Sequence, residues 1–379
     1  MKRVYFDNAA TTPLRQEVIE TMGKVLAESF GNASSTHGFG RSSKALLESC
    51  RKQIASQFNV SAAEIVFTSG GTEANNFILQ SAVKNLGIEH IITSKIEHHA
   101  VLHTVQELEA ISNIQVFYVN LKGGEIDFDH LEELLQSPKK ILVSLMHVNN
   151  EVGTILDIER VTRLCKEYGA LFHSDTVQSV GHLPLNLQQI HADFIISSAH
   201  KFHGPKGVGF AFIRKDSGLK PILFGGEQER GLRPGTEALH NIAGLTEALK
   251  LSYSNLDVEK KYIKDLKAYF IEQLKENISD VQFNGVSDDL SKSTYTILNV
   301  RFPSLKAKGD MIQFQLDLKG IACSRGSACQ SGSVQASHVL MEMLLQEELM
   351  QPSLRFSLSF FNTKEEVDYV VKCLSELSN

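Results

Sequence analysis

The chain has 379 residues, of which 42% are hydrophobic and 22% charged, as is ordinary for a folded globular protein. Its 38 basic and 44 acidic residues give a net charge of −6, which argues against direct nucleic-acid binding. Five cysteines without a Cys-x-x-Cys pair argue against a disulfide framework and favour a reducing, cytoplasmic location. We expect no targeting segment and no membrane association, since no apolar run is long enough to span a bilayer.

The N-terminal part predicts a short strand, a polar loop and two helices. The strand covers residues 4–6 and enters a loop of small residues over 7–13. Apolar residues then recur at helical spacing over 15–29 and again over 41–58.

Residues 64–68 predict a strand that meets Ser69-Gly70-Gly71-Thr72 and then a helix. A glycine turn before a helix N-terminus suits an anion, because backbone N–H groups converge there. The stretch lacks the Gly-Lys-Ser/Thr of a nucleoside triphosphate loop. A plain turn between strand and helix remains the alternative.

Strands and helices continue to alternate as far as about residue 200. Strands are predicted at 90–93, 115–119, 141–146, 170–173 and 192–196, and helices at 100–110, 129–136 and 157–168. This order predicts an α/β fold with a mostly parallel sheet covered on both faces. Ligands gather at the carboxyl ends of such strands. The polar residues placed there are Thr72, His98, Asn149, Asn150, Glu151, Asp175, Gln178, His200 and Lys201.

From about residue 255 the pattern changes to that of a smaller α+β unit. A long charged helix over 258–277 precedes strands near 295–300 and 354–358 and a final helix. We therefore expect a large domain over 15–255 and a small domain over 256–379, with residues 1–14 packed on the latter.

Lys201 follows a buried strand and precedes a loop broken by Gly204, Pro205 and Gly207. Burial disfavours the charged form of lysine, and a neutral amine at such a place can attack an aldehyde. Taken alone, such a lysine is more often a surface residue on a loop, and the rest of the chain is what favours the functional interpretation.

Cys329 lies in a stretch of glycine and serine over 324–333, which predicts an exposed, mobile loop. A thiol there is placed for nucleophilic chemistry, whereas an average cysteine is a small buried residue. Cys323 follows an apolar segment and is expected to be structural. His99 and His103 have the spacing of a metal pair on a helix, but no third ligand is evident, so we expect no metal.

Several ordered motifs, spread over almost the whole chain, resemble the cysteine desulfurases, in particular their first group. These enzymes form part of the class V aminotransferase branch of the fold-type I pyridoxal 5'-phosphate (PLP) enzymes. The motifs lie at 6–12, 31–37, 68–76, 149–153, 173–178, 198–207, 228–236 and 324–329.

The resemblance implies a seven-stranded sheet, a PLP cofactor and a role for each matching residue. Lys201 would carry PLP as a Schiff base, Asp175 would pair with the pyridine nitrogen, Gln178 would bind the ring hydroxyl, and His98 would stack on the ring. Gly71, Thr72, Ser198 and His200 would hold the phosphate, and Thr236 would complete that site in the neighbouring subunit of a homodimer. Asn150 and Arg355 would take the substrate carboxylate.

The activity implied is removal of sulfur from L-cysteine, giving L-alanine and a persulfide on Cys329. Lys201 and His98 would move protons, and the sulfur would pass to an acceptor protein in iron–sulfur cluster assembly or tRNA thiolation. Three alternatives remain: a selenocysteine lyase, a plain aminotransferase, which needs no such thiol, and a sulfur-relay protein with little turnover.

Overall fold

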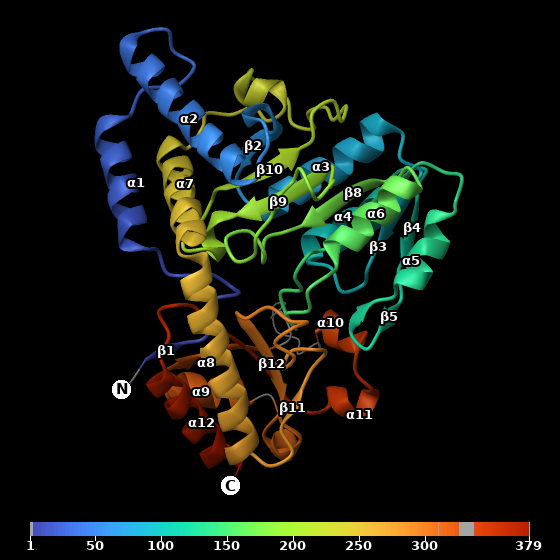
Figure 1. Ribbon diagram of the computed structural model, residues 1–379, viewed down its shortest axis with the longest axis vertical. Coiled ribbons are helices and arrows are strands. Elements are labelled where there is room, and N and C mark those ends of the chain that lie inside the picture. The colour runs from blue at the N-terminus through green and yellow to red at the C-terminus, as the bar shows by residue number, and fades with distance from the viewer. Residues whose placement is uncertain (1–2, 310, 326–336, 379) are drawn as a thin grey trace.

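The computed structural model describes residues 3–309, 311–325 and 337–378 (Figure 1). Its largest sheet has seven strands in the order β2-β10-β9-β8-β7-β3-β4. The bounds are β2 Ile65–Thr68, β10 Gly209–Ile213, β9 Phe194–Ser198, β8 Leu171–Asp175, β7 Ile141–Ser144, β3 His90–Thr93 and β4 Gln115–Tyr118. Neighbouring strands from β9 to β4 pair in parallel, while β10 is antiparallel to both β9 and β2. The predicted mostly parallel α/β sheet is confirmed.

Helices cover both faces of this sheet because its strands are apolar on both sides. The helices of this part are α1 Gln16–Glu28, α2 Gly38–Gln57, α3 Gly71–Leu86, α4 His99–Ile111, α5 Phe128–Leu135, α6 Ile158–Glu167 and α7 Leu239–Ser254. Ile65 and Phe67 of β2 join one hydrophobic cluster with α1, α2, α5, α6 and α7. Val66, between them, joins a second cluster with α3 and α4.

The smaller part includes the long helix α8, Leu256–Asn277, which continues from the foot of α7 in Figure 1. A four-stranded sheet has the order β11-β12-β15-β14, with β11 Gln282–Phe283, β12 Ile297–Arg301, β15 Ser353–Ser357 and β14 Ser324–Arg325. The helices here are α9 Met311–Leu318, α10 His338–Met341, α11 Gln346–Leu349 and α12 Lys364–Ser378. A separate cluster forms its core, although the division into 15–255 and 256–379 stays a prediction.

The N-terminal segment packs on this smaller part. β1, Val4–Tyr5, pairs in parallel with β13, Ile321–Ala322, and Asp7 forms a bridge with Ser357 of β15. Phe6 is fully buried beside Phe270 and Phe356.

Short elements complete the structure. They are the hairpin β5 Leu121–Lys122 and β6 Glu125–Ile126, and the 3₁₀ turns η1 Ala62–Glu64, η2 Ala199–Lys201, η3 Gln228–Gly231 and η4 Pro303–Lys308. No helix in the described part of the chain is long and apolar enough to cross a membrane.

Candidate active site

A cavity of about 580 Å³ opens at the carboxyl edge of the seven-stranded sheet. It brings together most of the residues singled out from the sequence, which come from six different segments. Those that line it are Gly71, Thr72, His98, Asn150, Asp175, Gln178, Ser198, His200, Lys201 and Arg355. Thr236 is exposed and does not line it, and Cys329 lies outside the described residues.

Lys201 ends the 3₁₀ turn η2, directly after β9. Its Nζ donates to the carbonyl oxygens of Ala9, at 2.7 Å, and Ala10, at 2.8 Å. Burial, and next the positive charge of Arg355, lower the pKa of Lys201 to about 8. The amine is therefore poised to lose its proton near neutral pH.

Asp175 is the last residue of β8, and its carboxylate is fixed on both oxygens. Oδ1 accepts from the backbone N–H of Val177 at 3.0 Å, and Oδ2 accepts from Nδ2 of Asn75 at 2.8 Å. Asn75 lies on α3, is 1% exposed, and was not singled out from the sequence. The signal lay in the 3.6-residue period, which puts Asn75 one turn after Gly71 on the face toward the sheet.

Gln178 and His98 are also held in place by backbone groups. Nε2 of Gln178 donates to the carbonyl of Ala9 at 3.0 Å. His98 is the N-cap of α4, and its Nδ1 accepts from the N–H of Ala100 at 3.1 Å. The side chain is exposed toward the cavity, yet the surrounding protein removes enough water to lower its pKa. A neutral His98 ring with Nδ1 accepting carries its hydrogen on Nε2.

The turn between β2 and α3 forms a cradle in which side chains have little room. A Cβ on Gly71 would lie 2.8 Å from Cγ2 of Val177, and Gly70 has a φ of +151°. Ser198, at the end of β9, faces this turn, since a Cβ on Gly70 would lie 3.3 Å from its Oγ. The first N–H groups of the 16-residue helix α3 are available there to an anion.

His200 directly precedes Lys201 in the sequence and also lines the cavity. Its Nδ1 lies 3.2 Å from Oγ1 of Thr11. Burial, and then the charge of Lys201, lower the pKa of His200 to about 4, so the ring is neutral at physiological pH.

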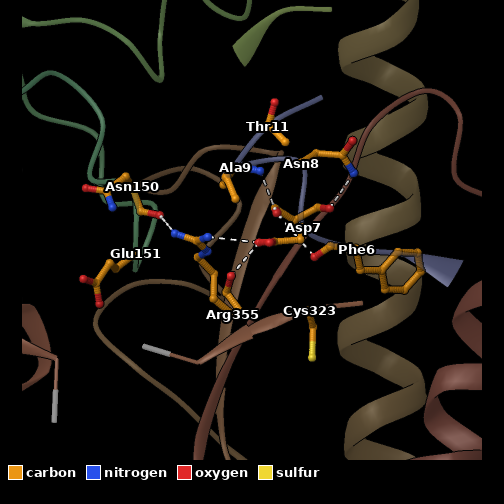
Figure 2. A network of polar contacts seen from close by, with 12 residues as sticks. Phe6, Asp7, Asn8, Ala9, Thr11, Asn150, Glu151, Cys323 and Arg355 are labelled. Atoms are coloured by element: carbon orange, nitrogen blue, oxygen red, sulfur yellow. Dashed lines mark hydrogen bonds and ion pairs between the residues drawn. The ribbon is translucent and has the colours of Figure 1, made fainter. Parts of the chain in front are cut away.

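Arg355 enters the cavity from β15 (Figure 2). Nη1 donates to the carbonyl of Asn150 at 2.8 Å, and Nη2 donates to Oδ1 of Asp7 at 3.0 Å. Nε is buried and has no hydrogen-bond partner. The guanidinium thus keeps donor capacity for a carboxylate ligand.

The four cysteines in the described part of the chain are all buried and unbridged: Cys50, Cys165, Cys323 and Cys373. Burial raises the pKa of Cys323 to about 12 and also raises the pKa of Cys50 and Cys165. These three thiols are protonated at neutral pH and are poor nucleophiles.

The segment that carries Thr236 is tied down by two ion pairs. Glu229 pairs with Arg51 at 2.6 Å, and both side chains are 2% exposed. Arg233 pairs with Glu73, in the first turn of α3, at 2.7 Å. Thr236 itself is not among the residues that line the cavity of its own chain.

A second cavity of about 850 Å³ lies between α3 and α4 and shares Thr72 and His98 with the first. It lacks Lys201, Asp175 and Arg355, so the chemistry belongs to the smaller cavity. Among the described residues, no group of three or more His, Cys, Asp or Glu side chains could hold a metal ion.

The donor set of the smaller cavity fits PLP. Lys201 offers an amine of lowered pKa to an aldehyde, Asp175 offers a fixed carboxylate to a ring nitrogen, and the Gly70–Gly71 turn offers a cradle to a phosphate. Each of these residues lines the same cavity.

Comparison with known proteins gives consistent matches over the full length of the chain. The family model for aminotransferase class V matches residues 4–370. The cysteine desulfurase IscS of Dictyoglomus turgidum is 42% identical over 100% of this chain and 95% of its own length. A solved NifS-like protein has a TM-score of 0.90 and 36% identity, with 99% of both chains covered. A structure of SspA in complex with cysteine has a TM-score of 0.81 and 32% identity over 94% of this chain and 99% of its own.

Proposed function

The chain belongs to the class V aminotransferase family, and on that premise we propose that it is a PLP-dependent cysteine desulfurase acting on L-cysteine. The observation that carries the proposal is the meeting of Lys201, Asp175 and Arg355 in one cavity. A relative at 42% identity is named cysteine desulfurase, and a similar structure holds cysteine.

The proposed reaction balances without an added oxidant. The carbon–sulfur bond of L-cysteine breaks, and a sulfur–sulfur bond forms to Cys329. The thiol hydrogen of Cys329 is passed to the β-carbon, which becomes the methyl group of L-alanine. The other product is a persulfide on Cys329, from which an acceptor protein takes the sulfur.

PLP, when bound, supplies an electron sink for the bond-breaking step. Asp175 would hold the ring nitrogen protonated, and Asn75 keeps its carboxylate aimed. Gln178 and His98 would position the ring, and Gly71, Thr72, Ser198 and His200 would take the phosphate. These roles rest on the family resemblance and on the shared cavity.

Lys201 and His98 are the groups suited to move protons. A lysine with a pKa of about 8 can release and take back a proton near neutral pH. The neutral His98 ring can give the hydrogen on Nε2. Arg355 would bind the substrate carboxylate beside Asn150, since Nη1 and Nη2 each keep an N–H that the bonds to Asn150 and Asp7 do not use.

Cys329 is the proposed nucleophile. The other four cysteines are buried, and raised pKa values keep at least three of them protonated. Cys329 follows Ser324, which donates to Asp7 beside Arg355, by five residues in the sequence.

We also propose a homodimer with shared sites. Thr236 is exposed, and two ion pairs fix the segment that carries it. A residue that contributes to the site of a second copy must be both exposed and held in place in this way. Light scattering should give twice the mass of the chain. Thr236→Ala should weaken PLP retention, whereas a monomer would contradict the arrangement. The cytoplasmic location stays a prediction.

The test of the function is alanine formation from L-cysteine by the purified protein with PLP and a reductant, with Cys329→Ser alongside. We expect alanine from the parent protein and none from the variant, which should keep the absorbance of bound PLP. Equal alanine from both would place the nucleophile elsewhere. No alanine from either, with selenocysteine consumed, would favour the lyase alternative.

A further inference from the structure

Asp7 contacts two side chains near the proposed site. Arg355 would bind the substrate carboxylate, and Ser324 precedes Cys329 in the sequence. Oδ1 of Asp7 accepts from Nη2 of Arg355 at 3.0 Å (Figure 2). The same oxygen accepts from Oγ of Ser324 at 2.7 Å. One carboxylate oxygen therefore serves both donors. Asp7 was noted in the sequence only as part of a motif.

Backbone hydrogen bonds of the neighbouring residue Phe6 fix the position of Asp7. The N–H of Phe6 donates to the carbonyl of Ala322 at 2.8 Å, and the carbonyl of Phe6 accepts from Ser357 at 2.7 Å. Ser324 and Arg355 are cross-strand partners in the antiparallel pair of β14 and β15. The N-terminal segment thus delivers the Asp7 carboxylate to two side chains already held side by side.

The negative charge of Asp7 compensates the positive charge of the buried Arg355 side chain. The Arg355 side chain is 10% exposed and that of Asp7 21%. A guanidinium so far removed from water needs a counter-charge, and a planar group held at two nitrogens can no longer rotate. Nη1 donates one hydrogen to Asn150 and Nη2 donates one to Asp7, so each of these nitrogens keeps a second N–H for a ligand.

We propose that Asp7 is a positioning residue: it fixes the Arg355 guanidinium in the orientation that receives the substrate carboxylate. Ser324 steadies Asp7 in this task, and it does so from the strand that leads toward Cys329 in the sequence. Asp7 itself does not touch the reacting atoms. The proposal rests on the proposed function only in taking the ligand of Arg355 to be an amino-acid carboxylate.

The test compares two ligands that differ by that carboxylate, L-alanine and ethylamine. Each is titrated against the PLP-loaded protein, and the change in cofactor absorbance gives the Kd. Asp7→Ala should raise the Kd of L-alanine ~10-fold and leave that of ethylamine within about twofold, because only the former uses Arg355. Asp7→Asn keeps an oxygen acceptor for both donors, so its effect on L-alanine should be smaller.

Ser324→Ala should act in the same direction as Asp7→Ala, by about 2- to 3-fold. Asp265→Asn, which removes an exposed carboxylate paired with Lys261 on α8, is the matched control and should change neither Kd. If Asp7→Ala fails to fold, the comparison of Asp7→Asn with the parent protein carries the test, with thermal unfolding as the check on folding.

Equal weakening of both ligands by the Asp7 variants would show a merely structural role and overturn the proposal. Unchanged or tighter L-alanine binding would overturn it as well. These outcomes are separable from failure of the proposed function: a protein that forms no alanine from L-cysteine can still bind L-alanine through Arg355. Conversely, an active desulfurase whose Asp7→Ala variant binds both ligands normally would refute the positioning role alone.

Discussion

Nδ2 of Asn75 donates a 2.8 Å hydrogen bond to Oδ2 of Asp175, and both side chains are buried. The two residues are 100 positions apart and belong to α3 and β8. The bond fixes the rotation of a carboxylate whose other oxygen is taken by the N–H of Val177. Asn75 is therefore the support on which the proposed role of Asp175 depends.

Asn75→Ala should lower kcat about tenfold and destabilise the fold by about 1–3 kcal/mol, since a buried acceptor loses its donor. The pH at which the absorbance of bound PLP changes should also move, because Asp175 is no longer held toward the ring. Absorbance titration and denaturant unfolding measure the two effects. A loss of stability with an unmoved spectral titration would make Asn75 structural only.

The rate at which the cofactor-free protein captures PLP should rise with pH through about 8. The neutral amine of Lys201 is the attacking form, and its pKa is lowered by burial and by Arg355. Capture should be about tenfold slower at pH 7 than on the plateau above pH 9. Stopped-flow absorbance gives the profile.

Arg355→Gln is the matched variant for this profile. It removes the positive charge that helps to lower the pKa of Lys201, so the midpoint should move upward. A parent midpoint near that of free lysine would contradict the assignment.

Lys201→Ala should lose the covalent link to PLP. Borohydride reduction should therefore attach no PLP to the chain of this variant.

Most of the fold could be predicted because its signals are local. Residues 90–93 have the predicted bounds of β3, and the ends of β8 and β9 deliver Asp175 and Lys201 as expected. The antiparallel strand β10 was missed, since the glycines before it indicate a loop. Helix α7 was also missed: it packs on both α1 and α2 and is apolar on several sides, so it has no single apolar face.

The site was predicted less completely where contacts are long-range. Asp175 ends a strand and Lys201 follows one, so both could be placed at the carboxyl edge of the sheet from local signals. Asn75 and Asp7 act through partners 100 and 348 residues away. The helical period places Asn75 on the face toward the sheet, but it does not identify Asp175 as the partner. The family resemblance predicted from the motifs is confirmed by the full-length relatives.

Lys267 should make the stability of the protein depend on pH. It is fully buried on α8 and donates to Oγ of Ser293 and the carbonyl of Thr294, each at 2.8 Å. Burial lowers its pKa from 10.5 to about 7, so the unfolded chain binds the proton more tightly. Its contribution to stability is therefore lowest below pH 7, rises as the pH rises, and is complete above about 10.5.

Lys267→Met removes this titration, and all other groups titrate alike in the two proteins. The free energy of unfolding of the parent relative to Lys267→Met should increase by about 2–3 kcal/mol between pH 6 and pH 9. Denaturant unfolding at both pH values measures this difference. Parallel pH curves for the two proteins would show that Lys267 titrates as it does in water.

Arg51→Met should destabilise the protein by about 3–5 kcal/mol, because Glu229 is left as a buried, unpaired charge. Glu229 also accepts from the N–H of Phe67 at 2.8 Å, so it cannot swing out to water without a further loss. The double variant Arg51→Met/Glu229→Gln should recover part of the free energy of unfolding. Additive losses in this double-mutant cycle would mean that the pair contributes no coupling.

The carbonyls of Ala9 and Ala10 bind Lys201, while Asp7 binds Arg355, so the first dozen residues of the chain form a wall of the cavity. During synthesis this segment is made before its partners, since Lys201 follows Ala9 by 192 residues and Arg355 follows Asp7 by 348. The pocket is therefore complete only after β15 has been made. A chain that ends before β15 would therefore keep Lys201 and Asp175 but would lack Arg355, the proposed anchor of the substrate carboxylate.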